Sequence, residues 1–226
     1  MIDIVRGLLA GRAPKYIQIP TAAAPEGPAV MAKWTRLGAE QADRLGVDAV
    51  PLPIADRAGA EDHVIAEQVR GAGLVYMSGG SPAFLAETLR DSAVWAEVLA
   101  AWRAGAALAG CSAGAMAMTS WVPQVRALHR PADPGLGLLP HLRVIPHFDK
   151  MLGWAPDLLT RVLLHAPEGV TVLGIDEDTA LVGGTVVWEV QGPQSVWSRG
   201  HGARVEHPAG STVITPGGAG EAAAAL

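Results

Sequence analysis

The sequence has little of what marks a secreted or membrane-spanning protein. Its 226 residues include one cysteine, Cys111, so no disulfide can form within the chain. No run reaches the ~18 consecutive apolar residues that a membrane-spanning helix needs. The N-terminus carries an acid at Asp3 and has no long apolar core, so it does not resemble a signal peptide. We therefore expect a cytoplasmic protein with no membrane partner.

Charges and cofactor motifs are also scarce. Charged residues make up 17% of the chain and the net charge is −5, whereas globular proteins usually contain roughly 25% charged residues. A net negative chain without a basic block argues against a nucleic-acid partner. The sequence has no HExxH motif, no cysteine pair and no GxGxxG after the first expected strand. We therefore expect no metal and no cofactor.

Apolar residues are plentiful. They make up 50% of the chain, enough for a sizeable core, and the length suits a single domain over residues 1–226. In the first half, short apolar runs alternate with segments of helical spacing. The strands expected there cover residues 15–20, 47–54, 73–77 and 106–109, and the helices cover residues 29–45, 61–70, 83–90 and 93–104. This alternation predicts an α/β fold of three layers, α/β/α, with a mostly parallel sheet.

The second half of the sequence is less regular. A loop rich in proline and glycine over residues 119–140 precedes an expected strand at 142–146 and an expected helix at 155–165. Beyond residue 170, short apolar runs separated by Gly and Pro predict short antiparallel strands. Trp188 and Trp197 in this region are compatible with a homodimer surface or with core packing.

The motif Gly110-x-Ser112-x-Gly114 follows the short apolar run at 106–109 and precedes small residues with good helix propensity. This is the pattern of a nucleophile elbow, in which a serine sits on a sharp, strained strand-to-helix turn. The turn is tight, so its flanking positions must lack bulky side chains. The motif predicts that Ser112 is a nucleophile. Cys111 precedes the elbow position, so its side chain is expected to point into packing.

Two backbone N–H groups are candidates for stabilising an oxyanion. The helix that begins after Ser112 directs its first N–H groups at the reacting centre, which favours Ala113 as one donor. Gly79-Gly80 follows the expected strand at 73–77, at the same carboxyl edge of the sheet where ligands bind. A glycine pair there allows close backbone approach and favours Gly80 as the second donor. A tight turn without a ligand is the other interpretation of this pair.

A serine nucleophile needs a base, normally a histidine oriented by a carboxylate. Among the seven histidines, His147 follows an expected strand and Pro146, at the edge predicted to be catalytic. Asp133 is the one acid between Ser112 and His147, although an Asp before a proline is also a common turn residue. The alternatives for the third member are Asp149, an acid in the cluster at 176–178, or no acid.

Four segments together resemble the peptidase S51 family, which contains the aspartyl dipeptidases called peptidase E and the cyanophycinases. They are the runs MSGGSP at 77–82, GCSAGA at 110–115, GLLP at 137–140 with PHF at 146–148, and GIDEDTA at 174–180. The resemblance implies a fold like that of the class I glutamine amidotransferases, with Ser112 as nucleophile, His147 as base, and Gly80 and Ala113 as oxyanion donors. It also implies an acid between nucleophile and base, where residues 127–130 contain none, so either Asp133 substitutes or the site is a dyad.

These observations predict a serine-type peptidase that cleaves small peptides or isopeptide-like amides. An esterase or other acyl hydrolase could use the same elbow. A catalytically silent relative that binds a small ligand is the third possibility, supported by the missing acid at the expected spacing.

Overall fold

The computed structural model describes residues 2–123, 131–154, 166–199 and 203–215. Its internal contacts divide the chain into two compact units, Ile2–Ala117 and Met118–Leu226. We call them the N-terminal unit and the C-terminal unit. The expectation of one domain over residues 1–226 stays a prediction. In the part of the chain that is described, no helix has the length and apolar character needed to cross a membrane.

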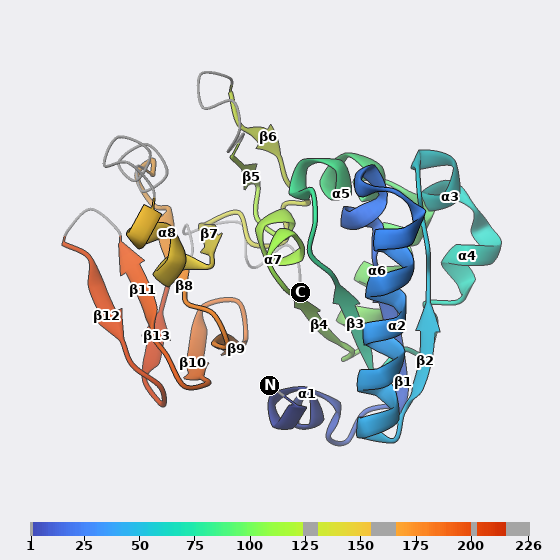
Figure 1. The fold of residues 1–226 in the computed structure, drawn as a ribbon, viewed down its shortest axis with the longest axis horizontal. Helices are drawn as coiled ribbons and strands as arrows, with labels where there is room; N and C mark the ends of the chain where they lie inside the picture. The colour runs from blue at the N-terminus through green and yellow to red at the C-terminus, as the bar shows by residue number, and fades with distance from the viewer. Residues whose placement is uncertain (1, 124–130, 155–165, 200–202, 216–226) are drawn as a thin grey trace. The chain divides into compact units, whose positions relative to one another are not determined.

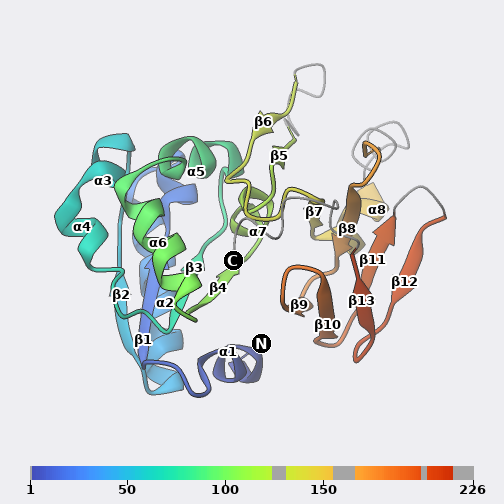
Figure 2. The same cartoon turned by 180° about the vertical axis from the view of Figure 1, so that it is seen from behind.

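The N-terminal unit contains a four-stranded parallel sheet of order β2-β1-β3-β4. Helices α2 and α6 lie on opposite faces of this sheet, as the front and back views show (Figures 1 and 2). Its strands are β1 (Lys15–Ile19), β2 (Asp48–Pro51), β3 (Leu74–Met77) and β4 (Ala107–Gly110). Its helices are α1 (Ile2–Leu9), the 3-10 helix η1 (Thr21–Glu26), α2 (Pro28–Leu45), α3 (Arg57–Glu61), α4 (His63–Glu67), α5 (Pro82–Leu89), α6 (Ala93–Arg103) and α7 (Ala113–Ala117).

Local sequence signals explain most of these boundaries. Gly46 ends α2 in the left-handed conformation, with φ of 68°. Ser81 and Ser92 begin α5 and α6, where each hydroxyl accepts a backbone N–H of the first turn. Strand β1 is buried through Ile17 and Ile19 on one face and through Tyr16 and Gln18 on the other, as expected for a strand covered on both faces. The α/β fold with a parallel sheet covered by helices is thus confirmed for this unit.

Three local expectations need correction. The helix expected at 61–70 is instead two short helices, because Asp62 accepts the Val64 N–H and starts α4 as a new helix. The segment after Pro20, where no helix was expected, is the 3-10 helix η1. Helix α1 was not expected, and it packs Val5 and Leu8 against the core of this unit.

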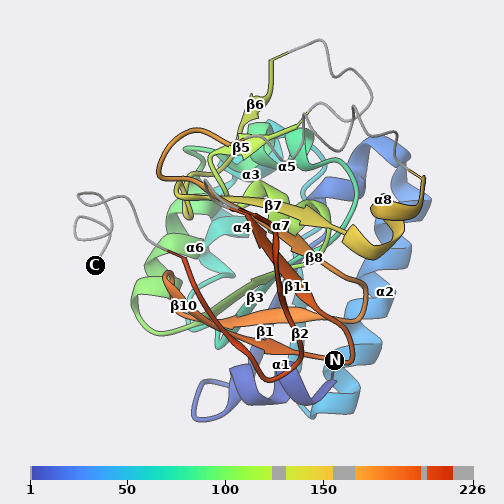
Figure 3. The ribbon, with the colours of Figure 1, turned by 90° about the vertical axis from the view of Figure 1, so that its left-hand side faces the viewer.

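The C-terminal unit is built from short strands, which face the viewer in Figure 3. One sheet has the order β12-β11-β8-β7, with β7 and β8 parallel and the other pairs antiparallel. A second sheet, β13-β10-β9, is antiparallel throughout, and β5 pairs with β6. The elements are β5 (Trp121–Val122), β6 (Asp133–Pro134), β7 (Leu142–Pro146), α8 (Phe148–Trp154), β8 (Thr171–Ile175), β9 (Ala180–Gly183), β10 (Val187–Gln191), β11 (Val196–Arg199), β12 (Val205–His207) and β13 (Thr212–Ile214).

The short antiparallel strands expected near the C-terminus are confirmed. The helix expected at 155–165 lies outside the described residues, and α8 begins directly after His147. Trp188 and Trp197 of this unit are both half-buried. Trp188 donates its indole N–H to Thr215, and Trp197 donates its own to Asp176. Packing therefore accounts for both indoles, and a homodimer stays an expectation.

Candidate active site

Ser112 occupies a strained turn between β4 and α7. Its φ is 49°, a left-handed conformation that is uncommon outside glycine. Cys111 before it donates its N–H to the Met77 carbonyl at 3.1 Å, and the Ser112 carbonyl accepts the Met116 N–H at 3.1 Å. The turn is thus tied on one side to β3 and on the other to α7. The sharp strand-to-helix turn predicted from the motif is present.

The two flanking glycines are required because backbone approaches them closely. A Cβ at Gly110 would lie 2.5 Å from the carbonyl carbon of Gly114. A Cβ at Gly114 would lie 2.2 Å from the carbonyl oxygen of Met77. Both distances are far below ordinary van der Waals contact, and neither neighbour is a flexible side chain. The GxSxG spacing therefore lets α7 pack directly on β3.

Gly114→Ala should therefore destabilise the protein by roughly 1–3 kcal/mol, the usual range for overpacking a well-packed site. The added methyl group meets the Met77 carbonyl of β3, so α7 or the strand must shift. Urea unfolding of the variant measures the change. Gly7→Ala is the matched control, because a Cβ at Gly7 in α1 has no neighbour within 4 Å. The control should be neutral or slightly stabilising, and equal destabilisation by both variants would contradict the steric argument.

The Gly79-Gly80 turn lies against Ser112 within the same unit. A Cβ at Gly79 would be 3.5 Å from Cβ of Ser112 and 3.1 Å from Cζ2 of Trp34. Gly80 has φ of 137°, and a Cβ there would be 2.2 Å from the Ala22 carbonyl oxygen. Gly80 thus excludes larger residues, whereas a Cβ at Gly79 would require the Trp34 ring to shift by a few tenths of an ångström. The fold brings together the two turns that carry Gly80 and Ala113, whose oxyanion role stays a prediction.

Trp34 of α2 is a neighbour of the elbow that the sequence did not identify. Its ring edge lies beside Gly79, and its carbonyl accepts a hydrogen bond from the buried Gln18 amide of β1. The helical spacing of α2 indicated packing, but no signal in the sequence placed this ring beside Ser112.

The thiol of Cys111, which precedes Ser112, lies in an environment that favours its protonated form. Burial raises the pKa of its thiol, and hydrogen bonds from the Tyr76 hydroxyl and the Gly79 N–H only partly offset burial. The thiolate is the reactive form of cysteine, so a raised pKa keeps the group inert. Cys111 is half-buried, and the expectation that its side chain points into packing stays a prediction.

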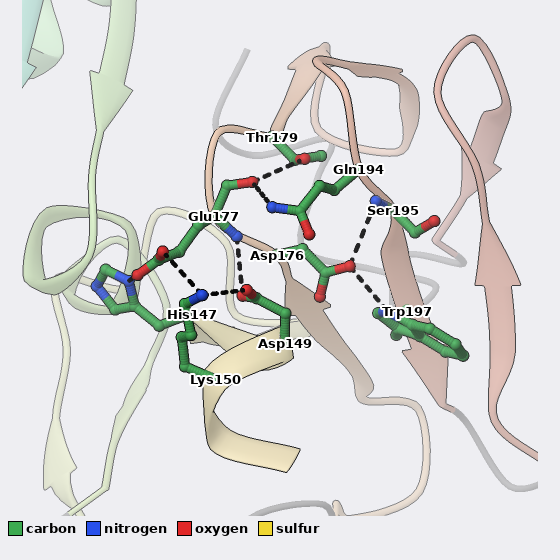
Figure 4. Close-up of polar contacts among 9 residues, drawn as sticks. All are labelled: His147, Asp149, Lys150, Asp176, Glu177, Thr179, Gln194, Ser195 and Trp197. Carbon is green, nitrogen blue, oxygen red and sulfur yellow. Dashed lines mark hydrogen bonds and ion pairs between the residues drawn. The ribbon is translucent and has the colours of Figure 1, made fainter. Parts of the chain in front are cut away.

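His147 lies between the end of β7 and the start of α8 in the C-terminal unit. Its φ is 53°, again left-handed, and its carbonyl accepts the Met151 N–H at 3.0 Å. Its Nδ1 lies 3.2 Å from Oε1 of Glu177, with both side chains partly exposed (Figure 4). A carboxylate only accepts, so this contact requires the proton on Nδ1. The imidazole is thus oriented by a carboxylate.

Strand pairing explains why His147 meets Glu177. Strands β7 and β8 are parallel, and Pro146 at the end of β7 lies opposite Ile175 at the end of β8. The residues that follow the two strands therefore lie at the same edge of the sheet. An acid in the cluster at 176–178 was one of the alternatives for the third residue of the triad. Within this cluster, Glu177 is the residue that contacts the His147 imidazole.

The other acids near His147 make different contacts (Figure 4). Asp149 accepts the backbone N–H of Glu177 at 3.0 Å. Asp176 is buried and accepts the Ser195 N–H and the Trp197 indole N–H through Oδ2, at 3.3 and 3.2 Å. Asp178 adopts φ of 55° in the turn before β9. These contacts fix the turn that carries Glu177.

The remaining predicted residues are accounted for as follows. Asp133 lies in β6, opposite Val122 of β5, and its catalytic role stays a prediction. Ser112 belongs to the N-terminal unit and His147 to the C-terminal unit, so their pairing also stays a prediction. Residues 127–130, where the resemblance implied an acid, lie outside the described residues. Within the described part of the chain, no group of three or more His, Cys, Asp or Glu residues is arranged to hold a metal ion.

Two other histidines have structural partners. His141 is buried, and its Nε2 lies 2.8 Å from the Thr185 carbonyl. Nε2 of His207 lies 2.8 Å from the Ser198 hydroxyl, and burial lowers the pKa of this imidazole. Among the residues that the structure describes, the partners of these two imidazoles are thus a carbonyl and a hydroxyl, in contrast to the carboxylate at His147.

Comparison with known proteins gives consistent results. The model of peptidase family S51 matches residues 1–185. A crystal structure of a peptidase from an acI-B1 Actinobacterium is 37% identical, covers 94% of this chain and 90% of its own, and has a TM-score of 0.87. A putative peptidase E protein from Listeria monocytogenes EGD-e shares the fold at 16% identity and a TM-score of 0.59, covering 92% of this chain and 93% of its own. No curated protein matches the chain.

Proposed function

Because this chain belongs to peptidase family S51 and is a serine peptidase, we propose that it cleaves small peptides or isopeptide-like amides with Ser112, His147 and Glu177. The resemblance to dipeptidases and cyanophycinases supports a small substrate. The observation that carries the assignment of the base is the 3.2 Å contact between Nδ1 of His147 and Oε1 of Glu177. It supplies the oriented imidazole that a serine nucleophile needs.

In the proposed mechanism, the Ser112 hydroxyl attacks the amide carbonyl while Nε2 of His147 takes its proton. Glu177 holds the Nδ1 proton and stabilises the imidazolium that forms. The imidazolium then protonates the leaving amine. Water, deprotonated by the same ring, attacks the acyl-enzyme and releases the acid. Each step uses Nε2 for proton transfer and Nδ1 for orientation.

The N–H groups of Gly80 and Ala113 are proposed to bind the oxyanion. The close contact of the Gly79-Gly80 turn with Ser112 supports this, as does the position of Ala113 at the first residue of α7. One such donor contributes ~3 kcal/mol to transition-state stabilisation. Charge that develops on the carbonyl oxygen is therefore met by backbone dipoles that need no rearrangement.

A panel of substrates tests the proposed specificity. The purified protein is assayed with aminoacyl p-nitroanilides, unprotected dipeptides, β-aspartyl isopeptides, p-nitrophenyl acetate and casein. We expect turnover of one or more of the small amides, at a kcat/KM about tenfold or more above the Ser112→Ala background, and no cleavage of casein. Turnover of the ester without any amide would favour an acyl hydrolase. Cleavage of casein would contradict a small-peptide enzyme.

A further inference from the structure

The turn that carries Glu177 joins β8 to β9 and is held through its backbone. The Glu177 carbonyl accepts the Gln194 amide at 2.8 Å and the Thr179 hydroxyl at 3.2 Å. Its N–H donates to Oδ1 of Asp149 at 3.0 Å. The Glu177 side chain itself is 40% exposed, so the packing around it is incomplete. The direction of its carboxylate therefore depends on how the Glu177 peptide is fixed.

Among these three partners of the Glu177 backbone, Asp149 belongs to the segment that carries His147, the proposed base. It stands two residues after His147, in the first turn of α8, and is half-buried. Its hydrogen bond therefore ties the His147 segment to the Glu177 turn, in addition to the contact of the imidazole with the carboxylate (Figure 4). A shift of either segment would have to break this second link.

The carboxylates of Asp149 and Glu177 would repel each other without a compensating charge. The Lys150 ammonium lies 3.6 Å from Oδ2 of Asp149 and 3.8 Å from Oε2 of Glu177. Partial burial by itself raises the pKa of Asp149, but the N–H groups of Glu177 and Lys150 and the Lys150 charge outweigh burial and hold it below its usual value. Asp149 is thus a carboxylate at neutral pH, and its bond to the Glu177 N–H is charge-assisted.

We propose that Asp149 is a positioning residue, which fixes the Glu177 peptide so that Oε1 faces Nδ1 of His147. The inference rests on the proposed catalytic role of Glu177. Asp149 touches neither substrate nor the reacting atoms in this scheme. Loss of its acceptor lets the 176–179 turn move relative to α8, so the imidazole is less often in the productive orientation. This affects the chemical step more than substrate binding.

Two substitutions at Asp149 separate its acceptor from its charge. Asp149→Ala removes both, whereas Asp149→Asn keeps an oxygen that can accept the Glu177 N–H. We expect Asp149→Ala to lower kcat for the best p-nitroanilide by about 10- to 100-fold, the range for outer residues that orient a catalytic group, with KM unchanged within about twofold. Asp149→Asn should recover most of the kcat. Glu168→Ala, an exposed acid of the same unit, is the matched control and should keep full activity.

Urea unfolding of each variant separates positioning from folding. If Asp149→Ala fails to fold, Asp149→Ser replaces it, because serine keeps a polar side chain in the first turn of α8 but is one bond shorter than aspartate, which weakens its bond to the Glu177 N–H. Equal kcat in Asp149→Ala and wild type would overturn the proposal, as would an equal loss in the Ala and Asn variants. Failure of the proposed triad gives a different result, since Glu177→Gln would then keep full kcat whatever Asp149 does.

Discussion

Ser112→Ala should lower peptide turnover by about 10⁴-fold or more and abolish covalent labelling by a fluorophosphonate probe. The probe reacts only with an activated serine hydroxyl, and alanine has no nucleophile. The strained turn is tied to β3 and α7 through backbone contacts, so removal of the hydroxyl should leave the fold intact. Gel fluorescence after labelling and steady-state kinetics on the p-nitroanilide panel measure the two effects.

Cys111→Ala is the matched control for the serine variant. Its thiol is the neighbouring side chain on the same elbow, but its raised pKa keeps it protonated. This variant should label and turn over like wild type, within about threefold. Labelling that persists in Ser112→Ala, or that disappears in Cys111→Ala with the fold intact, would overturn the assignment of Ser112 as the nucleophile.

Glu177→Gln should lower kcat by about 10²- to 10⁴-fold with a small change in KM. The neutral amide keeps the size of the side chain but no longer stabilises the imidazolium, and it can present an N–H that favours the wrong tautomer of His147. The loss should appear in the labelling rate as well, because acylation by the probe also needs the base. Stopped-time labelling and saturation kinetics measure both.

Asp133→Asn provides the decisive comparison for the third member of the triad. Asp133 was the acid favoured by its place between Ser112 and His147, whereas Glu177 is the acid at the imidazole in the structure. We expect Asp133→Asn to retain kcat within about threefold. A large loss in Asp133→Asn together with full activity in Glu177→Gln would restore the prediction made from chain order and exclude Glu177.

The proposed nucleophile and base both adopt the left-handed backbone conformation. Four non-glycine residues in the described part of the chain have positive φ: Asp91, Ser112, His147 and Asp178. Aspartate tolerates the left-handed region, because its short polar side chain can bond locally. Histidine is also enriched in this region, whereas serine is not, and residues held in sparsely populated conformations cost about 1–3 kcal/mol each and cluster at functional sites. His147 directly follows the parallel strand β7, and Ser112 follows the parallel strand β4 after one intervening residue, each at the carboxyl end of its strand.

Local sequence was sufficient to predict a structural feature wherever the cause of that feature lies within a few residues of it. The GxSxG spacing predicted the sharp turn, because Gly110 and Gly114 approach backbone that allows no Cβ. Alternating apolar runs and helical segments predicted the parallel sheet of the N-terminal unit, and Gly46 marked the end of α2. The break at Asp62 was missed, because the capping bond competes with a helical pattern that continues through it.

The identity of the acid at His147 was decided by tertiary structure. Glu177 is 30 residues away along the chain, and the sequence placed three acids at the end of a strand without showing which strand lies beside it. The parallel pairing of β7 with β8 sets Pro146 opposite Ile175 and so brings the two strand ends together. Sequence alone determined which residue types and turns the chemistry requires. Strand order, which arises from packing across the whole sheet, selected the carboxylate that meets the imidazole.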